Sequence, residues 1–157
     1  MNASPERPLS AITVAGIVYR NHQFLMIEER IANENKLNQP AGHVEPGESL
    51  LEAVQREVLE ETRYAFHPES VLGMYHSNPP AGRRILRIAI IGSVEPEPDQ
   101  APLDSGIIAV HWLSPQTITA KQSALRSPFV TQCIHDYLRG QRFDLALLHS
   151  LTGATAC

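Results

Sequence analysis

Hydrophobic residues gather in five strand-like segments along this chain. The first two cover residues 12–20 (ITVAGIVYR) and 23–30 (QFLMIEER), and a two-residue polar spacer between them is typical of a hairpin. After a polar loop expected at residues 33–38, the stretch NQPAGHVEPGE contains two prolines and two glycines, which favours turns and close approach of the backbone to a ligand. The remaining strand-like segments are residues 71–76, 85–94 and 107–113.

Two segments have the signals of helices. Ser49 followed by Glu52 forms a capping box, which predicts a helix from Leu50 to about Thr62. Leu51, Val54 and Val58 recur at helical spacing and give this helix a buried stripe. A second helix is predicted from the pair Ser127-Pro128, suited to the N-cap and first helical positions, to a stop at Gly140. Together with the strands, these helices indicate an α/β layered domain with a helix on each face.

Length and composition are consistent with one globular domain. The 157 residues, 43% of them hydrophobic, are enough to bury a core, and we expect a single domain over residues 1–157 with a loosely ordered tail after about residue 145. Cys133 and Cys157 have no metal-ligand spacing, which indicates neither a disulfide framework nor a zinc site and favours a cytoplasmic location. No apolar run reaches the length of a membrane span, and the net charge of −4 offers no basic surface for duplex nucleic acid.

One helical stretch, REVLEE at residues 56–61, is unfavourable by itself. Glu57, Glu60 and Glu61 occupy positions i, i+3 and i+4, so they share one face and repel one another. Two of them also lie in the last turn, where the helix dipole disfavours anions by about 0.3 to 1 kcal/mol each. A surface helix with ion pairs to Arg56 is one interpretation. A divalent cation removes the conflict more directly, because Mg²⁺ takes hard oxygen ligands and leaves positions for substrate phosphates.

The residues around REVLEE resemble a known signature. The segment GHVEPGESLLEAVQREVLEE (residues 42–61) is similar to the Nudix box, which runs glycine, five residues, glutamate, seven residues, Arg-Glu, an aliphatic residue, any residue and Glu-Glu. The box then continues with any residue and a glycine, and here Arg63 stands in the glycine position. That glycine normally ends the helix in a left-handed conformation, which costs another residue about 1 kcal/mol. The segments at residues 38–43, 103–114 and 125–143 further resemble the NudJ phosphatase branch of the superfamily.

The resemblance implies a fold and a chemistry. The fold is a Nudix-type α/β/α sandwich with a mixed β-sheet. The activity is Mg²⁺-dependent hydrolysis, with Mn²⁺ as a possible substitute, of phosphoanhydride bonds in nucleoside di- and triphosphates, thiamine diphosphate and hydroxymethylpyrimidine diphosphate. It implies metal ligation by the Glu57, Glu60 and Glu61 carboxylates and the backbone carbonyl of Gly42, with Arg56 and Glu48 in the catalytic set. Glu48 either supports this arrangement or is a favourable anion near the helix N-terminus.

Outside the box, three residues are candidates with two interpretations each. Asp104, in an acidic proline-rich loop, is either an extra acidic ligand or base or a turn-forming residue, and the general base is either a box glutamate or Asp104. Arg87 interrupts an apolar run, so it either binds substrate phosphate or marks the solvent face of an edge strand. His43 either contacts substrate or is a solvated loop residue. Tyr75 and Tyr137 either stack on a substrate ring or pack in the core.

Two alternatives to this function stay open. Pro79 falls about where ADP-sugar pyrophosphatases carry a proline, so that activity is the nearest enzymatic rival. A Nudix-fold binding module without turnover is the second, and the intact box residues argue against it. The expected partner is a small-molecule phosphoanhydride substrate, and the protein is expected to be a monomer or a homodimer.

Overall fold

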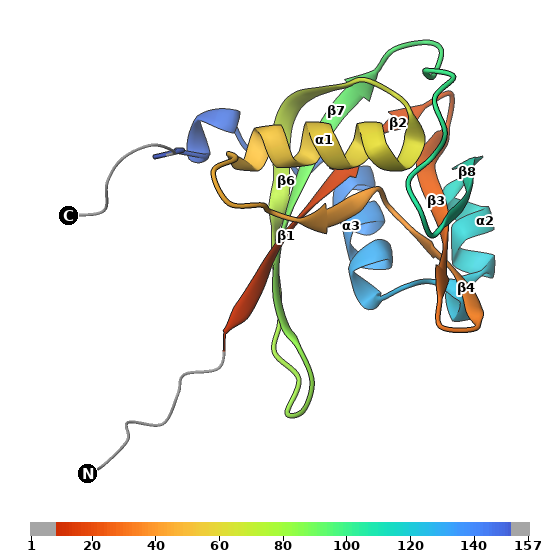
Figure 1. The fold of residues 1–157 in the computed structure, drawn as a ribbon, viewed down its shortest axis with the longest axis horizontal. Helices are drawn as coiled ribbons and strands as arrows, with labels where there is room; N and C mark the ends of the chain where they lie inside the picture. The colour runs from red at the N-terminus through yellow and green to blue at the C-terminus, as the bar shows by residue number, and fades with distance from the viewer. Residues whose placement is uncertain (1–8, 152–157) are drawn as a thin grey trace.

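The strands form two sheets in the computed structural model, which describes residues 9–151. One sheet has the order β5-β1-β7-β6, and the other joins β2, β3 and β4, with β8 also paired to β3 (Figure 1). In the first sheet β1 and β7 are parallel and the other pairs antiparallel, so the sheet is mixed. The strands are β1 (Ser10–Ile17), β2 (Tyr19–Arg20), β3 (Gln23–Ile31), β4 (Glu34–Asn38), β5 (Ala41–His43), β6 (Phe66–Ser77), β7 (Arg84–Val94) and β8 (Ile107–Leu113).

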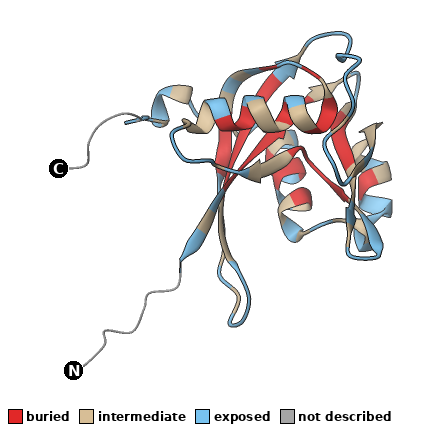
Figure 2. Cartoon of the chain, in the orientation of Figure 1, coloured by how far each residue is buried: buried red, intermediate tan, exposed pale blue. Residues whose placement is uncertain are grey.

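A helix covers each face of the first sheet. Helix α1 (Leu50–Thr62) packs on β1, β5 and β6, while α3 (Pro128–Leu138) packs on the opposite face against β6 (Figure 1). Residues of the strands alternate between two cores, because successive side chains of a strand point to opposite faces. Ile88 and Ile90 of β7 lie in the core under α1, and Ala89 and Ile91 lie in the core under α3. In Figure 2 the buried positions lie on α1, on α3 and along the strands. The predicted α/β sandwich with a helix on each face is confirmed.

The bounds of α1 agree with the prediction because its signals are local. The Ser49 hydroxyl accepts a hydrogen bond from the Glu52 amide at 3.2 Å, and the Glu52 carboxylate accepts one from the Ser49 amide at 2.7 Å, which completes the capping box. At the other end Arg63 adopts φ 64° and ψ 7°, and its amide donates to the Leu59 carbonyl at 2.9 Å. Arg63 therefore takes the left-handed conformation that glycine usually supplies at this position.

Several predicted boundaries are wrong. The polar loop expected at residues 33–38 is largely strand β4, which pairs with β3 from Ile27–Asn38 to Ile31–Glu34. Strand β6 is longer than the predicted 71–76. Helix α2 (Pro115–Ala120) and the 3₁₀ turns η1 (Gln122–Ala124) and η2 (Leu145–Leu147) were not predicted. Ser127 does occupy the N-cap position of α3, but its hydroxyl makes no capping hydrogen bond.

The C-terminal segment continues past the sheet. Asp144 caps η2 by accepting a hydrogen bond from the Ala146 amide at 2.8 Å, and Leu145 and Leu148 pack against the core under α1. Residues 152–157 of the predicted loose tail lie outside the described residues. Within residues 9–151, no helix has the length and apolar character needed to cross a membrane.

Candidate active site

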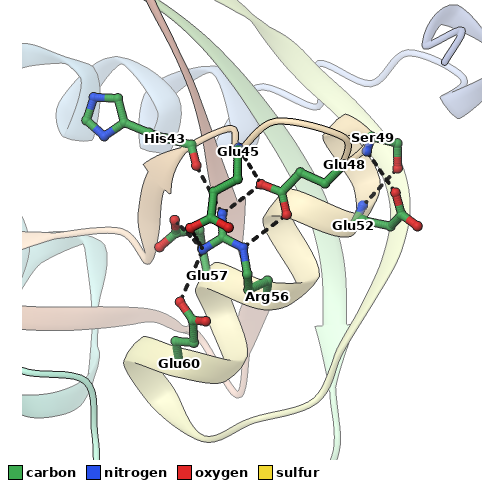
Figure 3. A network of polar contacts seen from close by, with 8 residues as sticks. All are labelled: His43, Glu45, Glu48, Ser49, Glu52, Arg56, Glu57 and Glu60. Carbon is green, nitrogen blue, oxygen red and sulfur yellow. Dashed lines mark hydrogen bonds and ion pairs between the residues drawn. The ribbon is translucent and has the colours of Figure 1, made fainter. Parts of the chain in front are cut away.

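The guanidinium group of Arg56 is the centre of a polar network on α1. It donates five hydrogen bonds, and two of them, at 3.0 and 2.7 Å, reach both oxygens of Glu48 (Figure 3). Its Nη1 donates to Glu57 at 2.8 Å and to Glu60 at 3.1 Å, and its Nη2 donates to the His43 carbonyl at 3.0 Å. One arginine therefore holds three carboxylates and the end of β5 in a fixed arrangement.

These contacts change the electrostatics of both partners. Hydrogen bonds from Arg56 lower the pKa of Glu48, and the Glu48 and Glu57 carboxylates in turn raise the pKa of Arg56. Glu48 also accepts a hydrogen bond from the Glu45 amide at 2.7 Å, so the turn before α1 is tied to the same network. Glu48 is thus ionised and engaged with Arg56, rather than only lying near the helix N-terminus.

Gly42 lies against the Glu57 carboxyl group. A Cβ atom on residue 42 would overlap all three terminal atoms of that side chain, so only glycine lets the carboxyl group approach β5 this closely. The Glu57 side chain is 12% exposed, and burial raises its pKa despite the hydrogen bond from Arg56. The close contact accounts for the glycine that begins the motif.

Glu61 contacts the backbone of Ala41, the first residue of β5. Glu61 is 8% exposed, and its carboxylate accepts a hydrogen bond from the Ala41 amide at 2.8 Å. Burial raises its pKa to about 8, and the nearby Glu57, Glu29 and Asp104 carboxylates act in the same direction. Glu57 and Glu60 therefore meet through Arg56, whereas Glu61 is held by the backbone.

The donor set fits a hard divalent cation. Among residues 9–151 no three acidic, histidine or cysteine side chains already converge tightly enough to enclose a metal ion. However, the carboxyl groups of Glu57, which is largely covered, and Glu61, which is buried, have raised pKa values chiefly because burial disfavours their charged forms. Positive charge placed beside their oxygens would relieve that penalty, and carboxylate oxygen is the ligand type that Mg²⁺ and Mn²⁺ accept.

Asp104 reaches the site on the loop between β7 and β8. The Asp104 amide donates to the Glu60 carbonyl at 3.0 Å, and the Asp99 amide donates to the Arg63 carbonyl at 2.8 Å, so this loop is fastened to the C-terminal end of α1 (Figure 1). The Asp104 carboxylate accepts a hydrogen bond from the Ser105 amide at 2.9 Å, and the Asp104 carbonyl accepts one from the Ile107 amide at 3.2 Å, which closes a turn. The Asp104 carboxylate also lies close enough to Glu61 to raise the pKa of Glu61. The two predicted interpretations of Asp104 are therefore compatible.

A cavity of about 420 Å³ opens on the side of β5 away from the Arg56 network, and both Arg87 and His43 line it. Arg87 lies on β7, between β1 and β6, and the residue is 7% exposed, so its placement on the solvent face of an edge strand is wrong. The His43 ring points away from the Arg56 network (Figure 3), and burial, with a smaller effect of Arg83, lowers its pKa.

The two tyrosines considered for ring stacking are engaged elsewhere. Tyr75 donates a hydrogen bond to Asp136 at 3.0 Å, and Tyr137 packs against Tyr19 and Phe24 with ring centroids 5.3 and 5.2 Å apart. Neither lines the cavity. Packing is therefore the interpretation that the structure favours for both.

Several cavity residues were missed from the sequence. One signal was available, since Thr13 interrupts an apolar strand as Arg87 does, and the two residues are register partners on β1 and β7. His43 is the partner of Thr13 on β5, so the three form a row across one face of the sheet. Other missed residues come from β3, β4, the segment that leads into α3 and α3 itself, which only the fold brings together; they include Glu29, Asn38, Arg126, Ser127 and Phe129.

Comparison with known proteins gives consistent matches. A family model described as the NUDIX domain matches residues 9–133. Phosphatase NudJ of Shigella boydii is 37% identical over 137 residues, covering 87% of this chain and 89% of the relative, and phosphatase NudJ of Escherichia coli K12 is 36% identical over the same length. A NUDIX hydrolase structure from Nitrosomonas europaea superposes with a TM-score of 0.89 at 41% identity, covering 93% of this chain and all of the other. A MutT protein from Methanosarcina mazei gives 0.70 at 25% identity, covering 88% of this chain and 99% of the other.

Proposed function

Since the chain belongs to the Nudix hydrolase family and is a phosphoanhydride-acting hydrolase, we propose that it cleaves small di- and triphosphates with Mg²⁺, or with Mn²⁺ in its place. The proposed substrates are nucleoside di- and triphosphates, thiamine diphosphate and hydroxymethylpyrimidine diphosphate. The relatives named phosphatase NudJ, at 36 to 37% identity over most of the chain, support this class. We also propose a cytoplasmic location and a monomeric or homodimeric state.

The observation that carries the proposal is the Arg56 network beside Gly42. Carboxylates that share one helix face repel one another and destabilise the helix, which indicates that they are kept for a function. Here Arg56 fixes Glu57 and Glu60 with hydrogen bonds of 2.8 and 3.1 Å. Glu57, Glu60, Glu61 and the Gly42 carbonyl are the groups that would hold the metal. When bound, a divalent cation supplies positive charge against phosphate oxygens and makes water a better nucleophile.

The side chains around these carboxylates have separate tasks in this mechanism. Arg56 positions the Glu57 carboxylate beside Gly42 and offsets part of the cost of burying its charge, and Glu48 keeps Arg56 in place through two hydrogen bonds. Either a glutamate of the Nudix box or Asp104, in its ionised form, takes the proton of the attacking water. His43 and Arg87, which line the cavity beside β5, contact the part of the substrate that extends beyond the cleaved bond. The displaced phosphate leaves from the phosphorus in line with the incoming water.

Two other functions compete with this one. An ADP-sugar pyrophosphatase has weak support, since Pro79 belongs to an exposed loop before β7 and does not line the cavity. A binding module without turnover has no use for a complete set of glutamates held by Arg56. Product analysis separates all three.

A substrate panel with product identification tests the proposal. With Mg²⁺, we expect orthophosphate from thiamine diphosphate or from nucleoside di- and triphosphates, whereas AMP with a sugar phosphate from an ADP-sugar would indicate the rival activity. The Glu60→Gln/Glu61→Gln variant should lose at least about 100-fold in kcat and remain folded. The matched control is Glu69→Gln/Glu97→Gln, at two exposed glutamates. Wild-type turnover by the first variant would make the proposed mechanism wrong.

A further inference from the structure

Unpaired polar atoms concentrate around the cavity beside β5. Over residues 9–151, seven buried side-chain nitrogen or oxygen atoms have no hydrogen-bond partner, and five of these belong to residues that line this one cavity. They are Thr13 Oγ1, Asn38 Oδ1, Arg87 Nε, Arg87 Nη1 and Ser127 Oγ. Buried polar groups normally find partners, so a cluster without them indicates a missing polar ligand.

Arg87 is the most costly member of this cluster. Its guanidinium group is charged at any pH a protein tolerates, and the residue is only 7% exposed to solvent. No described carboxylate forms an ion pair with it, and its guanidinium carbon lies 4.9 Å from the centre of the Phe129 ring. A ring face offsets only part of the cost of burying a cation. An anion in the cavity would supply the rest.

The surroundings of Arg87 also favour an anion. Arg83 and Arg126 line the same cavity, and the N-terminal end of α3, which carries positive partial charge, opens beside it at Ser127 and Phe129. Glu29 is the one acidic residue of the lining. Its carboxylate is already engaged, since Asn38 donates to it at 3.2 Å and Arg126 lies 3.5 Å away.

The cavity is separate from the Arg56 network but adjacent to it. Strand β5 lies between them, because the His43 carbonyl accepts from Arg56 while the His43 ring points the other way and lines the cavity (Figure 3). Gly42 and Ala41 line the cavity as well, and the same two residues contact Glu57 and Glu61. A phosphate chain bound at the carboxylates therefore needs only to pass β5 to reach Arg87.

We propose that this cavity is a subsite for a further phosphate group of the substrate, beyond the two joined by the bond that is cleaved, and that Arg87 is its specificity-determining cation. The inference rests on the proposed function and deepens it: substrates with three phosphates are preferred over those with two. Thr13 and Ser127 donate their hydroxyl protons to the same oxyanion. The free Asn38 oxygen accepts from a protonated phosphate oxygen or a substrate hydroxyl.

Calorimetric binding with Mg²⁺ and methylene-bridged analogues of ATP and ADP, together with orthophosphate, tests the subsite without turnover. Arg87→Met should weaken the triphosphate analogue by about 30-fold and the diphosphate analogue by less than about threefold. Arg87→Lys should restore part of the loss. Arg30→Met, which removes an exposed arginine outside the lining, is the matched control and should bind as the wild type does.

Stability distinguishes a binding role from a structural one. Without ligand, Arg87→Met should melt at or above the wild-type temperature, because it removes a buried unpaired charge, and it should lose the stabilisation that the triphosphate analogue gives the wild type. If it does not fold, Arg126→Met and Ser127→Ala carry the binding test. Equal weakening of both analogues, unchanged binding, or orthophosphate binding as tight as that of the triphosphate analogue would overturn the subsite. Hydrolysis by the wild type would leave the proposed function standing in each case.

Discussion

Arg56, which is partly buried, and Arg87, which is buried, belong to one small domain, yet their surroundings are opposite. Arg56 donates five hydrogen bonds to three carboxylates and one carbonyl, and each of these partners is part of the chain. Arg87 has unpaired Nε and Nη1 atoms, and its guanidinium group lies over the Phe129 ring. The charge of Arg56 is balanced by carboxylates of the folded protein, whereas the charge of Arg87 has no such partner among residues 9–151 without a ligand.

The comparison shows that burial of a charge does not by itself reveal its role. When all the partners of a guanidinium group lie within the protein, the guanidinium positions other side chains. Its removal then leaves several carboxylates uncompensated. A guanidinium without partners costs stability in the free protein and repays it on binding. The following variants separate the two cases, beginning with the largest expected effect.

Methionine at each arginine gives the sharpest contrast. Arg56→Met should lower the free energy of unfolding by about 3 kcal/mol at pH 7, since Glu48, Glu57 and Glu60 lose their shared cation. Arg87→Met should leave the free energy of unfolding unchanged or raise it. Urea denaturation at equilibrium measures both variants, and equal destabilisation would remove the distinction drawn between the two sites.

Gly42→Ala should break the contact between β5 and Glu57. The added methyl group overlaps the Glu57 carboxyl, so this side chain must leave its position beside Arg56, and kcat/KM should fall about 100-fold. Gly73→Ala is a suitable control, because there a Cβ would meet only the tips of the Tyr75 and Gln141 side chains, at 3.1 Å or more. A Gly42→Ala enzyme with normal activity would show that the close approach is not needed.

Glu48→Gln tests the arginine network through pH. The pKa of Glu48 is lowered in the folded protein by Arg56, so its contribution is present above the ordinary value of 4.5 and is lost as pH falls through the folded value. The variant should therefore cost about 1 to 2 kcal/mol at pH 7, and the difference from wild type should shrink in acid. Glu45→Gln, at a 65% exposed side chain 4.0 Å from Arg56, should change little at either pH.

Arg63→Gly has the smallest expected effect and the opposite sign. The left-handed backbone at φ 64° suits glycine, so the variant should gain about 0.5 to 1 kcal/mol of stability with unchanged kcat. Arg63→Ala removes the same side chain but keeps the strain, and the difference between the two variants isolates the backbone cost. No gain over alanine would mean that Arg63 carries no such strain.

Elements specified by neighbouring residues were predicted from the sequence, and those specified by distant ones were not. Helix α1 has its capping box within four residues, and its bounds agree with the prediction. Strand β4 (ENKLN) has weak strand propensity and forms because β3 offers an edge to pair with. Helix α2 has six residues, too few for a clear periodic pattern.

The same limit applies to the site. The carboxylates and Arg56 lie within one stretch of helix, so their spacing carries the information. Whether Arg87 lies on an edge or a central strand depends on the parallel pairing of β7 with β1, which joins residues more than seventy positions apart. Its unpaired state further depends on Phe129 and Ser127, contributed by α3. No local pattern contains these relationships.

The hydrogen bonds that hold the β7–β8 loop against α1 have a consequence for how the sequence can evolve. Main-chain atoms make the hydrogen bonds of Asp99 and Asp104 with the end of α1, and the Arg20 side chain donates to the Glu95 and Pro96 carbonyls of this loop. Hydrogen bonds of this kind place few demands on side-chain identity. The remaining residues of 95–106, apart from Asp104, Glu95 with its contact to His67 and Gly106 with its φ of 93°, can therefore vary while the loop stays beside the carboxylates. This makes the loop a natural place for evolution or a randomised library to alter substrate choice without rebuilding the fold.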